Sequence, residues 1–330
     1  MLLYSLLLFG IGIALLLKSS NALVGNAAKL AKAFGTSEFV IGVGLIAVGT
    51  SLPEFVVASI SSFTNNSGIA LGNIIGANIA NIALNLGIAA SIAAICIKRK
   101  IFEKECLIVF GSVVLLYVFS MDGIISRADG MILLAIFGYY ILFLLRRMKR
   151  LEDVFSLRSY MDLFFRNGKN AQPKANGTIE TKVLALSVIS LIGIVLGGYI
   201  FVNGAIGLAN DFGLSSSIIG LTLVALSTSS PELAVSLQAL KKKKPNLLLG
   251  NILGSNITNI LLVLGFAALL NPLNVAKNLL DYGMPLMLIV TTILLMFAYV
   301  DLKISRREGL LLIGIYIAAI YFSFAGAITA

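Results

Sequence analysis

Two glutamates stand at matching places in two similar octapeptides, AVGTSLPE at 47–54 and ALSTSSPE at 225–232. Glu54 and Glu232 are 178 residues apart, and each directly follows a proline. Proline lacks an N–H and pushes the preceding residue out of helical geometry, so nearby backbone carbonyls are expected to lose their partners. Two carboxylates and freed carbonyls then form a set of oxygen ligands with two negative charges. Hard cations prefer such ligands, and Ca²⁺ takes roughly 6–8 of them.

Neighbouring hydroxyls extend this set of oxygen ligands. Thr50 and Ser51 precede the first proline, and Thr228 and Ser229 hold the matching positions in the second octapeptide. The chain has two cysteines and no histidine, so thiolate and imidazole ligands for Zn²⁺ or Cu⁺ are excluded. The chemistry indicated is the binding of a hard cation by oxygen atoms alone.

The elements that must position these residues are membrane helices. Hydrophobic residues make up 58% of the chain and charged residues 12%, with a mean hydropathy of +0.99. Soluble domains carry about 25% charged residues. Thirteen of the fifteen acidic residues fall in predicted loops or near span ends, whereas Glu54 and Glu232 lie deep inside apolar runs. A carboxylate at that depth costs about 2.5–3.5 kcal/mol on insertion scales, which favours a functional role for the pair.

A membrane-spanning helix needs about 20 mainly apolar residues. Ten segments meet this criterion, and they lie approximately at 2–31, 38–62, 69–96, 104–121, 128–146, 182–209, 216–240, 246–270, 281–300 and 308–327. The sequence therefore predicts an all-α polytopic membrane protein with ten transmembrane helices.

The basic residues predict the orientation of these helices. If the 147–181 segment is cytoplasmic, 22 of the 25 lysines and arginines lie on the cytoplasmic side or at its edge. Such a bias is typical of membrane proteins, whose cytoplasmic loops are rich in Lys and Arg. We therefore expect a multi-pass plasma-membrane protein with both termini extracellular and a cytoplasmic linker. The net charge of +10 then requires no nucleic-acid partner.

The chain also contains an internal repeat. Shifted by 178 residues, LGNIIGANIANIALNLG at 71–87 matches LGNILGSNITNILLVLG at 249–265 in 12 of 17 positions. Each half carries five predicted spans, an odd number, so the second half must enter the membrane from the opposite side. Inverted repeats of this kind are typical of secondary transporters, whose substrate site lies near the midplane between the halves. We predict three parts: a first five-helix repeat at 1–146, a linker at 147–181 and a second five-helix repeat at 182–330.

The second repeated motif carries amides as well as glycines. Asn81 and Asn259 are the amides expected to face the cation, one turn beyond Asn78 and Asn256. Asn85 has an apolar counterpart in the repeat, Val263, and is interpreted as a packing residue.

At GTSLPE and GNIIGANIANI the chain resembles the sodium/calcium exchanger family of the calcium:cation antiporter superfamily, as a prokaryotic-type member. The resemblance covers the whole chain and favours sodium coupling, because proton-coupled relatives typically carry a Gly-Asn-x-x-Glu core. It implies that the first and sixth helices slide across the core. It also implies a set of cation ligands, which are Glu54, Glu232, Thr50, Thr228, Asn81, Asn259, Ser51, Ser229, Ala47, Ala225 and Ser255.

Three departures from the family pattern bear on this set. Ser227 and Ser230 replace the usual Gly and Leu in the second octapeptide. Ala77 stands where many relatives have Ser, so one flanking Na⁺ position is expected to lose a ligand. Asn259 stands where several relatives have Asp, which keeps two negative charges at the site and disfavours cotransport of K⁺.

The expected activity is antiport, in which Na⁺ and Ca²⁺ compete for the two carboxylates and exchange sides by alternating access. The alternative is a Ca²⁺/H⁺ antiporter that uses the same glutamates. A channel fits inverted odd-span repeats less well, and an intramembrane enzyme lacks the usual catalytic groups. The expected partners are the transported ions and the lipid bilayer, with no cofactor and no obligatory protein partner.

Overall fold

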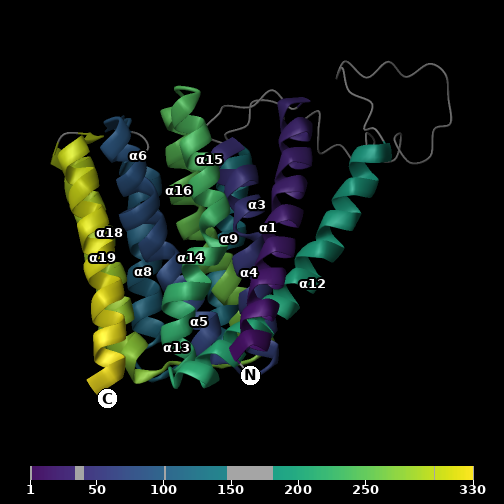
Figure 1. Ribbon diagram of the computed structural model, residues 1–330. Coiled ribbons are helices and arrows are strands. Elements are labelled where there is room, and N and C mark those ends of the chain that lie inside the picture. Colours follow the sequence, from purple (N-terminus) through teal and green to yellow (C-terminus); the bar gives the residue numbers. More distant parts are fainter. Residues whose placement is uncertain (1, 34–40, 100–101, 147–180, 301, 330) are drawn as a thin grey trace.

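A computed structural model describes residues 2–33, 41–99, 102–146, 181–300 and 302–329, which are almost entirely helical (Figure 1). Short π-helical segments, labelled η, interrupt several of the α-helices. The elements before the linker are α1 (Leu2–Ala33), η1 (Ile41–Ile46), α3 (Ala47–Thr50), α4 (Leu52–Phe63), α5 (Ser67–Ile79), η2 (Ala80–Leu86), α6 (Gly87–Ile92), β1 (Ile95–Cys96), η3 (Phe102–Cys106), α8 (Leu107–Phe119), β2 (Ile124–Ile125) and α9 (Arg127–Arg146).

The elements after the linker follow a similar order. They are α12 (Thr181–Phe212), α13 (Ser216–Ile219), η4 (Gly220–Val224), α14 (Ala225–Thr228), α15 (Ser230–Lys241), α16 (Pro245–Thr258), η5 (Asn259–Leu264), α17 (Gly265–Leu270), β3 (Leu273–Asn274), η6 (Leu279–Gly283), α18 (Met284–Val300), β4 (Lys303–Ile304) and α19 (Arg306–Thr329). The predicted linker, 147–181, lies outside the described residues except for its last residue.

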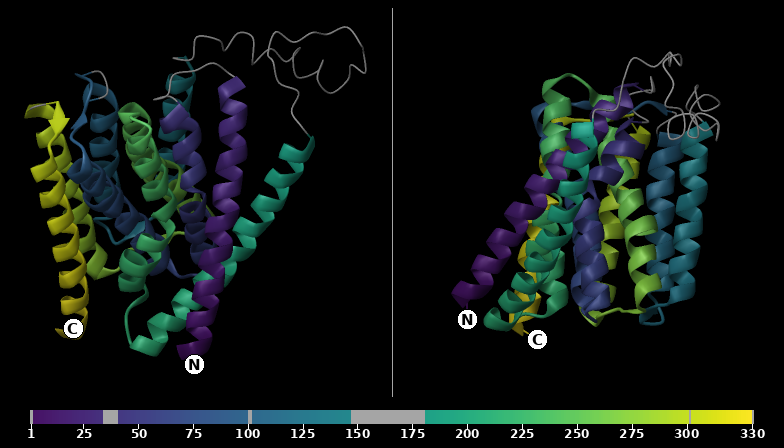
Figure 2. Two further views of the ribbon diagram at one scale, coloured as in Figure 1. Left: turned by 45° about the horizontal axis from the view of Figure 1, so that its top comes forward. Right: turned by 90° about the vertical axis from the view of Figure 1, so that its right-hand side faces the viewer.

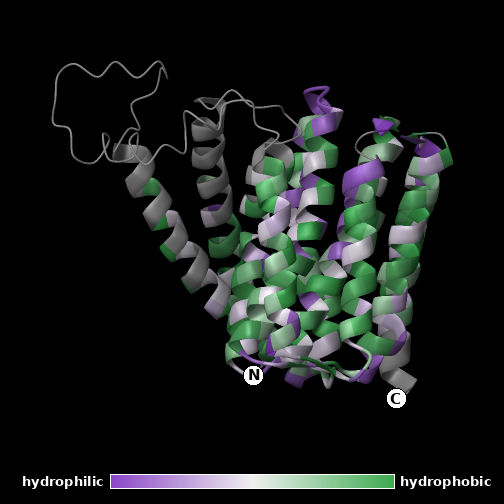
Figure 3. Ribbon diagram, turned by 180° about the vertical axis from the view of Figure 1, so that it is seen from behind, coloured by the Kyte–Doolittle hydropathy of each residue, from purple (hydrophilic) through white to green (hydrophobic). Residues whose placement is uncertain are grey.

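Six helical runs in the described residues are long and apolar enough to cross a membrane. They are Leu2–Ser19, Ser67–Ile92, Arg127–Leu144, Ser216–Lys241, Pro245–Leu270 and Leu279–Val300. Helices suit this environment because every backbone polar group in lipid must be bonded within the segment. The molecule is thus a helical protein of the membrane type, while the count of ten spans and the inversion of the halves stay predictions. Hydrophobic residues dominate the middle of the helices, and hydrophilic ones gather mainly toward their ends (Figure 3).

Two of these runs form the centre of the molecule. The run Ser67–Ile92 joins α5, η2 and α6, and the run Pro245–Leu270 joins α16, η5 and α17. In each, 83% of the apolar window is buried inside the protein, against 17% for Leu2–Ser19. The two segments that carry the repeated Asn motif are therefore shielded from lipid, as a polar site requires.

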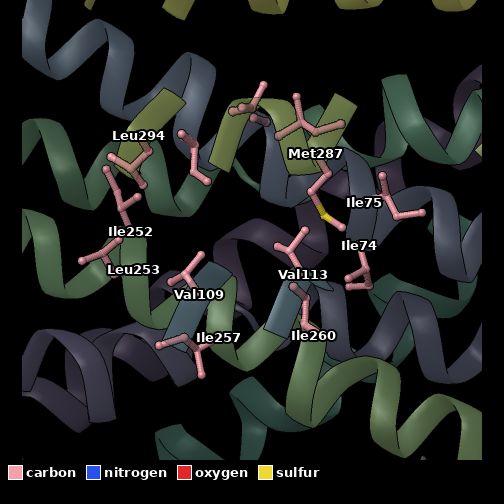
Figure 4. Packing of buried hydrophobic residues seen from close by; sticks show 14 of the residues in the cluster. Ile74, Ile75, Val109, Val113, Ile252, Leu253, Ile257, Ile260, Met287 and Leu294 are labelled. Carbon is pink, nitrogen blue, oxygen red and sulfur yellow. The ribbon is translucent and has the colours of Figure 1, made fainter. Parts of the chain in front are cut away.

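The apolar core joins the two halves. Side chains of α5, α8, α16 and α18 interdigitate there, among them Ile75, Val113, Ile252, Ile257 and Met287 (Figure 4). Lipid tails are as apolar as these side chains, so close packing contributes more here than removal from water. Such a core holds α5 and α16 in a defined position relative to each other.

The long helices α1 and α12 pack against each other and run in opposite directions (Figures 1 and 2). Glycines allow this contact: a Cβ on Gly197 would lie 2.6 Å from the backbone nitrogen of Leu16, and one on Gly12 would meet the backbone of Phe201. Small residues at helix contacts are typical of membrane bundles. Ser5 Oγ also donates a hydrogen bond to Asp211 Oδ2 over 2.7 Å.

Two short antiparallel strand pairs connect the halves outside the helices. Strand β1 pairs with β4, with Ile95 opposite Ile304, and β2 pairs with β3, with Ile125 opposite Leu273. Each pair takes one strand from each side of the linker. The start of α1 and the end of α19 lie at the same end of the molecule (Figures 1 and 2).

Candidate cation site

The two predicted carboxylates are completely buried. Glu54 and Glu232 are both 0% exposed, and they occupy the first turns of α4 and α15, directly after Pro53 and Pro231. The Oε2 atom of each glutamate has no hydrogen-bond partner in the described part of the protein. A buried carboxylate oxygen without a partner is costly, and a cation bound next to it would remove that cost.

Each glutamate is contacted by a serine from the other octapeptide. Ser229 Oγ donates to Glu54 Oε1 over 3.4 Å, and Ser51 Oγ donates to Glu232 Oε1 over 3.5 Å. Ser255, on α16, also donates to Glu232 Oε1 over 3.5 Å. The structure therefore brings together carboxylates and hydroxyls that the sequence places about half a chain apart.

The two threonines bridge the octapeptides to the central helices. Thr50 Oγ1 donates to Asn251 Oδ1 over 3.2 Å and lies 3.3 Å from Ser255 Oγ. Thr228 Oγ1 donates to Asn73 Oδ1 over 2.9 Å. Both threonines are 0% exposed. These hydrogen bonds hold the two predicted hydroxyl ligands against the wall of the site.

The expectation that carbonyls lose their partners is wrong for the two predicted carbonyl ligands. Ala47 O accepts hydrogen bonds from Ser51 N over 2.9 Å and from Thr50 Oγ1, in the same helix, over 3.2 Å. Ala225 O accepts from Ser229 N over 3.0 Å and from Thr228 Oγ1 over 3.3 Å.

The reason is the position of the proline. In a helix the missing N–H of Pro53 or Pro231 would have bonded four residues back, to Gly49 O or Ser227 O, which are not the alanine carbonyls. Both of these carbonyls nevertheless accept backbone hydrogen bonds at the helix cap, and in the second half Ser230 Oγ also donates to Ser227 O over 2.7 Å. Ser227 and Ser230, the two serines that depart from the family pattern, are thus joined by a hydrogen bond just before the proline.

The predicted amides Asn81 and Asn259 are buried, but their bonding differs. Asn81 Oδ1 accepts a hydrogen bond from Asn85 Nδ2 over 2.9 Å. Asn259 Nδ2 donates to Asn78 Oδ1 over 3.3 Å, and Asn259 Oδ1 has no partner in the described residues. Both residues lie in π-helical segments, η2 and η5, which are frequent at functional sites because they redirect side chains.

The interpretation of Asn85 as a packing residue is wrong. Its Nδ2 donates both to Asn81 Oδ1 and to Ser229 O, the latter over 3.4 Å. The sequence contained one signal: a polar amide within a predicted apolar span is costly, and comparison with Val263 alone concealed it.

The wall of the site is not symmetric. Asn251 Nδ2 donates to Glu232 O and to Ser236 Oγ, each over 3.2 Å. The counterpart of Ser236 is Ala58, and Asn73 Nδ2 has no partner among the described atoms. The sequence does not name the partners of these two amides, because the partners come from elsewhere in the chain.

The donor set of the site suits a hard cation. No lysine or arginine forms an ion pair with either glutamate in the described part of the chain. Within that part, no group of three or more His, Cys, Asp and Glu side chains is arranged to hold a metal ion. A cation between the two carboxylates would complete its shell with hydroxyl, amide and carbonyl oxygens, a combination typical of Ca²⁺ and Na⁺ rather than of Zn²⁺.

Apolar helices around two buried carboxylates are typical of a membrane transport protein. A family model described as sodium/calcium exchanger protein matches residues 4–146 and 182–325. The sodium/calcium exchanger MaX1 of Methanosarcina acetivorans is 32% identical over an alignment 332 positions long, which covers 93% of this chain and 95% of MaX1. An uncharacterized membrane protein of Methanocaldococcus jannaschii is 35% identical, and the alignment covers 94% of this chain and 95% of that protein.

Solved structures agree with this assignment. The sodium-calcium exchanger NCX_Mj, soaked with 2.5 mM Na⁺ and 10 mM Sr²⁺, superposes with a TM-score of 0.68 at 33% identity, over 97% of this chain and 99% of NCX_Mj. The chain belongs to the sodium/calcium exchanger family, and it is of the prokaryotic type. Members of this family are antiporters and not enzymes; Ca²⁺ and Na⁺ are their substrates, and they require no cofactor.

Proposed function

We propose that this protein exchanges Na⁺ for Ca²⁺ across the membrane by alternating access, with both ions competing for Glu54 and Glu232. The observation that carries the proposal is the pair of fully buried carboxylates, each with one oxygen that lacks a partner in the described residues. The names of MaX1 and NCX_Mj, both sodium/calcium exchangers, support the choice of ions.

Competition explains why transport would be an exchange. Ca²⁺ and a set of Na⁺ ions need the same carboxylate oxygens, so binding of one excludes the other. Without a cation, two negative charges remain in a medium of low dielectric constant, and closure around them is unfavourable. Only the loaded site would then change sides.

We further propose the ligands around the glutamates. Thr50, Ser51 and Ser255 surround Glu232, and Thr228 and Ser229 contribute on the side of Glu54, as their hydrogen bonds support. Asn81 and Asn259 would add amide oxygens. Ala47 and Ala225 would have to contribute the remaining lone pairs of carbonyls that already accept hydrogen bonds.

The proposed architecture consists of ten transmembrane helices in two inverted repeats, 1–146 and 182–330, with 147–181 as a cytoplasmic linker. The opposite directions of α1 and α12, the first helices of the two halves, support the inversion. The plasma membrane with extracellular termini is the orientation that the basic residues favour.

The test is a flux assay on purified protein in liposomes. An outward Na⁺ gradient should drive uptake of radiolabelled Ca²⁺, and Glu54→Gln and Glu232→Gln should each reduce it to background. Glu103→Gln is the matched control, because this glutamate lies on the surface in an ion pair with Arg99. Absence of Na⁺-driven uptake in the wild type, or full activity of both glutamine variants, would contradict the proposal. Uptake driven by a pH gradient without Na⁺ would select the Ca²⁺/H⁺ alternative.

A further inference from the structure

Asn85 is an amide that the second half of the chain does not repeat. It lies in η2 at 1% exposure, and its counterpart Val263 is fully buried in η5. A buried amide among apolar side chains is costly unless its polar atoms find partners. The partners of Asn85 identify what it does.

The contacts of Asn85 settle which end of its amide faces the site. Ser229 O is a backbone carbonyl and can only accept a hydrogen bond, so the Asn85 atom that lies 3.4 Å from it must be the nitrogen. The same nitrogen lies 2.9 Å from Asn81, so the atom that Asn81 presents to it must be the oxygen. Two amides whose orientations are usually ambiguous are therefore both determined by one carbonyl.

The equivalent amide in the other half is held the opposite way. Asn259 gives its nitrogen to Asn78 Oδ1, and Asn78 gives its own nitrogen to Met287 Sδ over 3.8 Å. Asn259 therefore keeps its oxygen without a partner in the described part, whereas Asn81 keeps its nitrogen without one. The two repeat-related amides therefore leave different polar atoms without a described partner.

We propose that Asn85 is a positioning residue of the cation site, which sets the orientation of Asn81 and links it to the Ser229 carbonyl of the opposite half. This inference rests on the proposed function, in which Asn81 contributes an amide oxygen. The oxygen has two lone pairs; Asn85 uses one and holds the other in a constant direction. Val263, at the equivalent place, forms no such hydrogen bond, and Asn259 is held through its nitrogen by Asn78 instead, so we expect the two ends of the site to bind cations differently.

The first experiment measures Ca²⁺ binding to the purified protein by titration calorimetry, which requires no transport. Asn85→Leu replaces the amide by an apolar side chain of similar size. It should raise the Kd for Ca²⁺ by about fivefold, the effect of one lost hydrogen bond. Val263→Leu, at the repeat-equivalent position, is the matched control and should leave the Kd within about twofold of the wild type.

A double-mutant cycle then tests whether Asn85 acts through Asn81. In an Asn81→Ala background, Asn85→Leu should change the Kd by less than about twofold. Additive effects of the two substitutions would overturn the proposal, as would an unchanged Kd in Asn85→Leu. A lower Tm of the cation-free protein with an unchanged Kd would show a purely structural role and would also overturn it.

Two safeguards separate the outcomes. If Asn85→Leu does not fold, Asn85→Ala makes the same comparison without a larger side chain. If the wild type binds Ca²⁺ but shows no Na⁺-driven flux, the exchange proposal fails while the role of Asn85 remains testable by binding.

Discussion

Thr228 Oγ1 donates a hydrogen bond to Asn73 Oδ1 over 2.9 Å, although the two residues are 155 positions apart. The corresponding bond from Thr50 to Asn251 Oδ1 measures 3.2 Å. Each bond ties a helix that ends before a proline to a central helix from the other half. The two bonds are related by the internal repeat, but the atoms around them are not the same.

The first prediction compares the loss of the two threonine hydroxyls. Thr228→Val should destabilise the protein by about 1–3 kcal/mol, because it leaves the buried Asn73 amide with no described partner. Thr50→Val should cost less, since Asn251 keeps its bonds to Glu232 O and Ser236 Oγ. Thermal unfolding of both variants in detergent without Ca²⁺ measures the difference. Equal losses of stability, or a larger loss in Thr50→Val, would contradict the asymmetry that these hydrogen bonds indicate.

The second prediction concerns the hydroxyl that only one half possesses. Ser255 Oγ lies 3.5 Å from Glu232 Oε1, whereas the equivalent Ala77 offers no oxygen beside Glu54. Ser255→Ala should therefore raise the Na⁺ concentration for half-maximal Ca²⁺ efflux by about fivefold, and Ala77→Ser should lower it. The measurement is the Na⁺ dependence of Ca²⁺ efflux from proteoliposomes. If both variants keep the wild-type Na⁺ dependence, these positions do not contact Na⁺.

The third prediction concerns a glycine that lets two helices approach. A Cβ on Gly76 would meet the carbonyl of Leu221 and lie 2.6 Å from the Cβ of Ala225. Gly76→Ala should destabilise the folded protein by about 1–3 kcal/mol, because neither backbone nor Ala225 can move away easily. Gly111→Ala on α8 is the control, since a Cβ there meets nothing within 4 Å. Size-exclusion profiles after heating should separate the two variants, and equal survival would contradict the packing argument.

The fourth prediction tests the orientation. Cys96 is exposed in β1, opposite Lys303, and Cys106 is buried. A membrane-impermeant maleimide should label Cys96 in inside-out vesicles and not in intact cells, because the neighbouring basic residues predict a cytoplasmic position. Cys96→Ser should abolish the labelling, since Cys106 is shielded. Labelling of intact cells would reverse the predicted topology.

The helices themselves were largely predictable, because apolar runs in lipid must satisfy their backbone internally. The predicted range 128–146 corresponds to α9, Arg127–Arg146, and the range 246–270 corresponds to the run Pro245–Leu270. The π-helical interruptions within the runs Ser67–Ile92 and Pro245–Leu270 were not predicted, since hydropathy averages over a window longer than one turn. Their position at Asn81 and Asn259 therefore came only from the structure.

The sequence by itself predicted the two carboxylates and the oxygen ligands of the proposed cation site. Glu54 and Glu232 stand out because charge deep in an apolar span is costly, and the repeat makes them equivalent. Only the tertiary structure decided which atoms remain available to a cation. Ala47 O already accepts two hydrogen bonds, and one lone pair of the Asn81 oxygen accepts from Asn85, whose nitrogen is oriented by Ser229 O from the other half. The hydrogen bond from Asn85 to Ser229 O joins residues 144 positions apart, so it follows from packing and no local pattern records it.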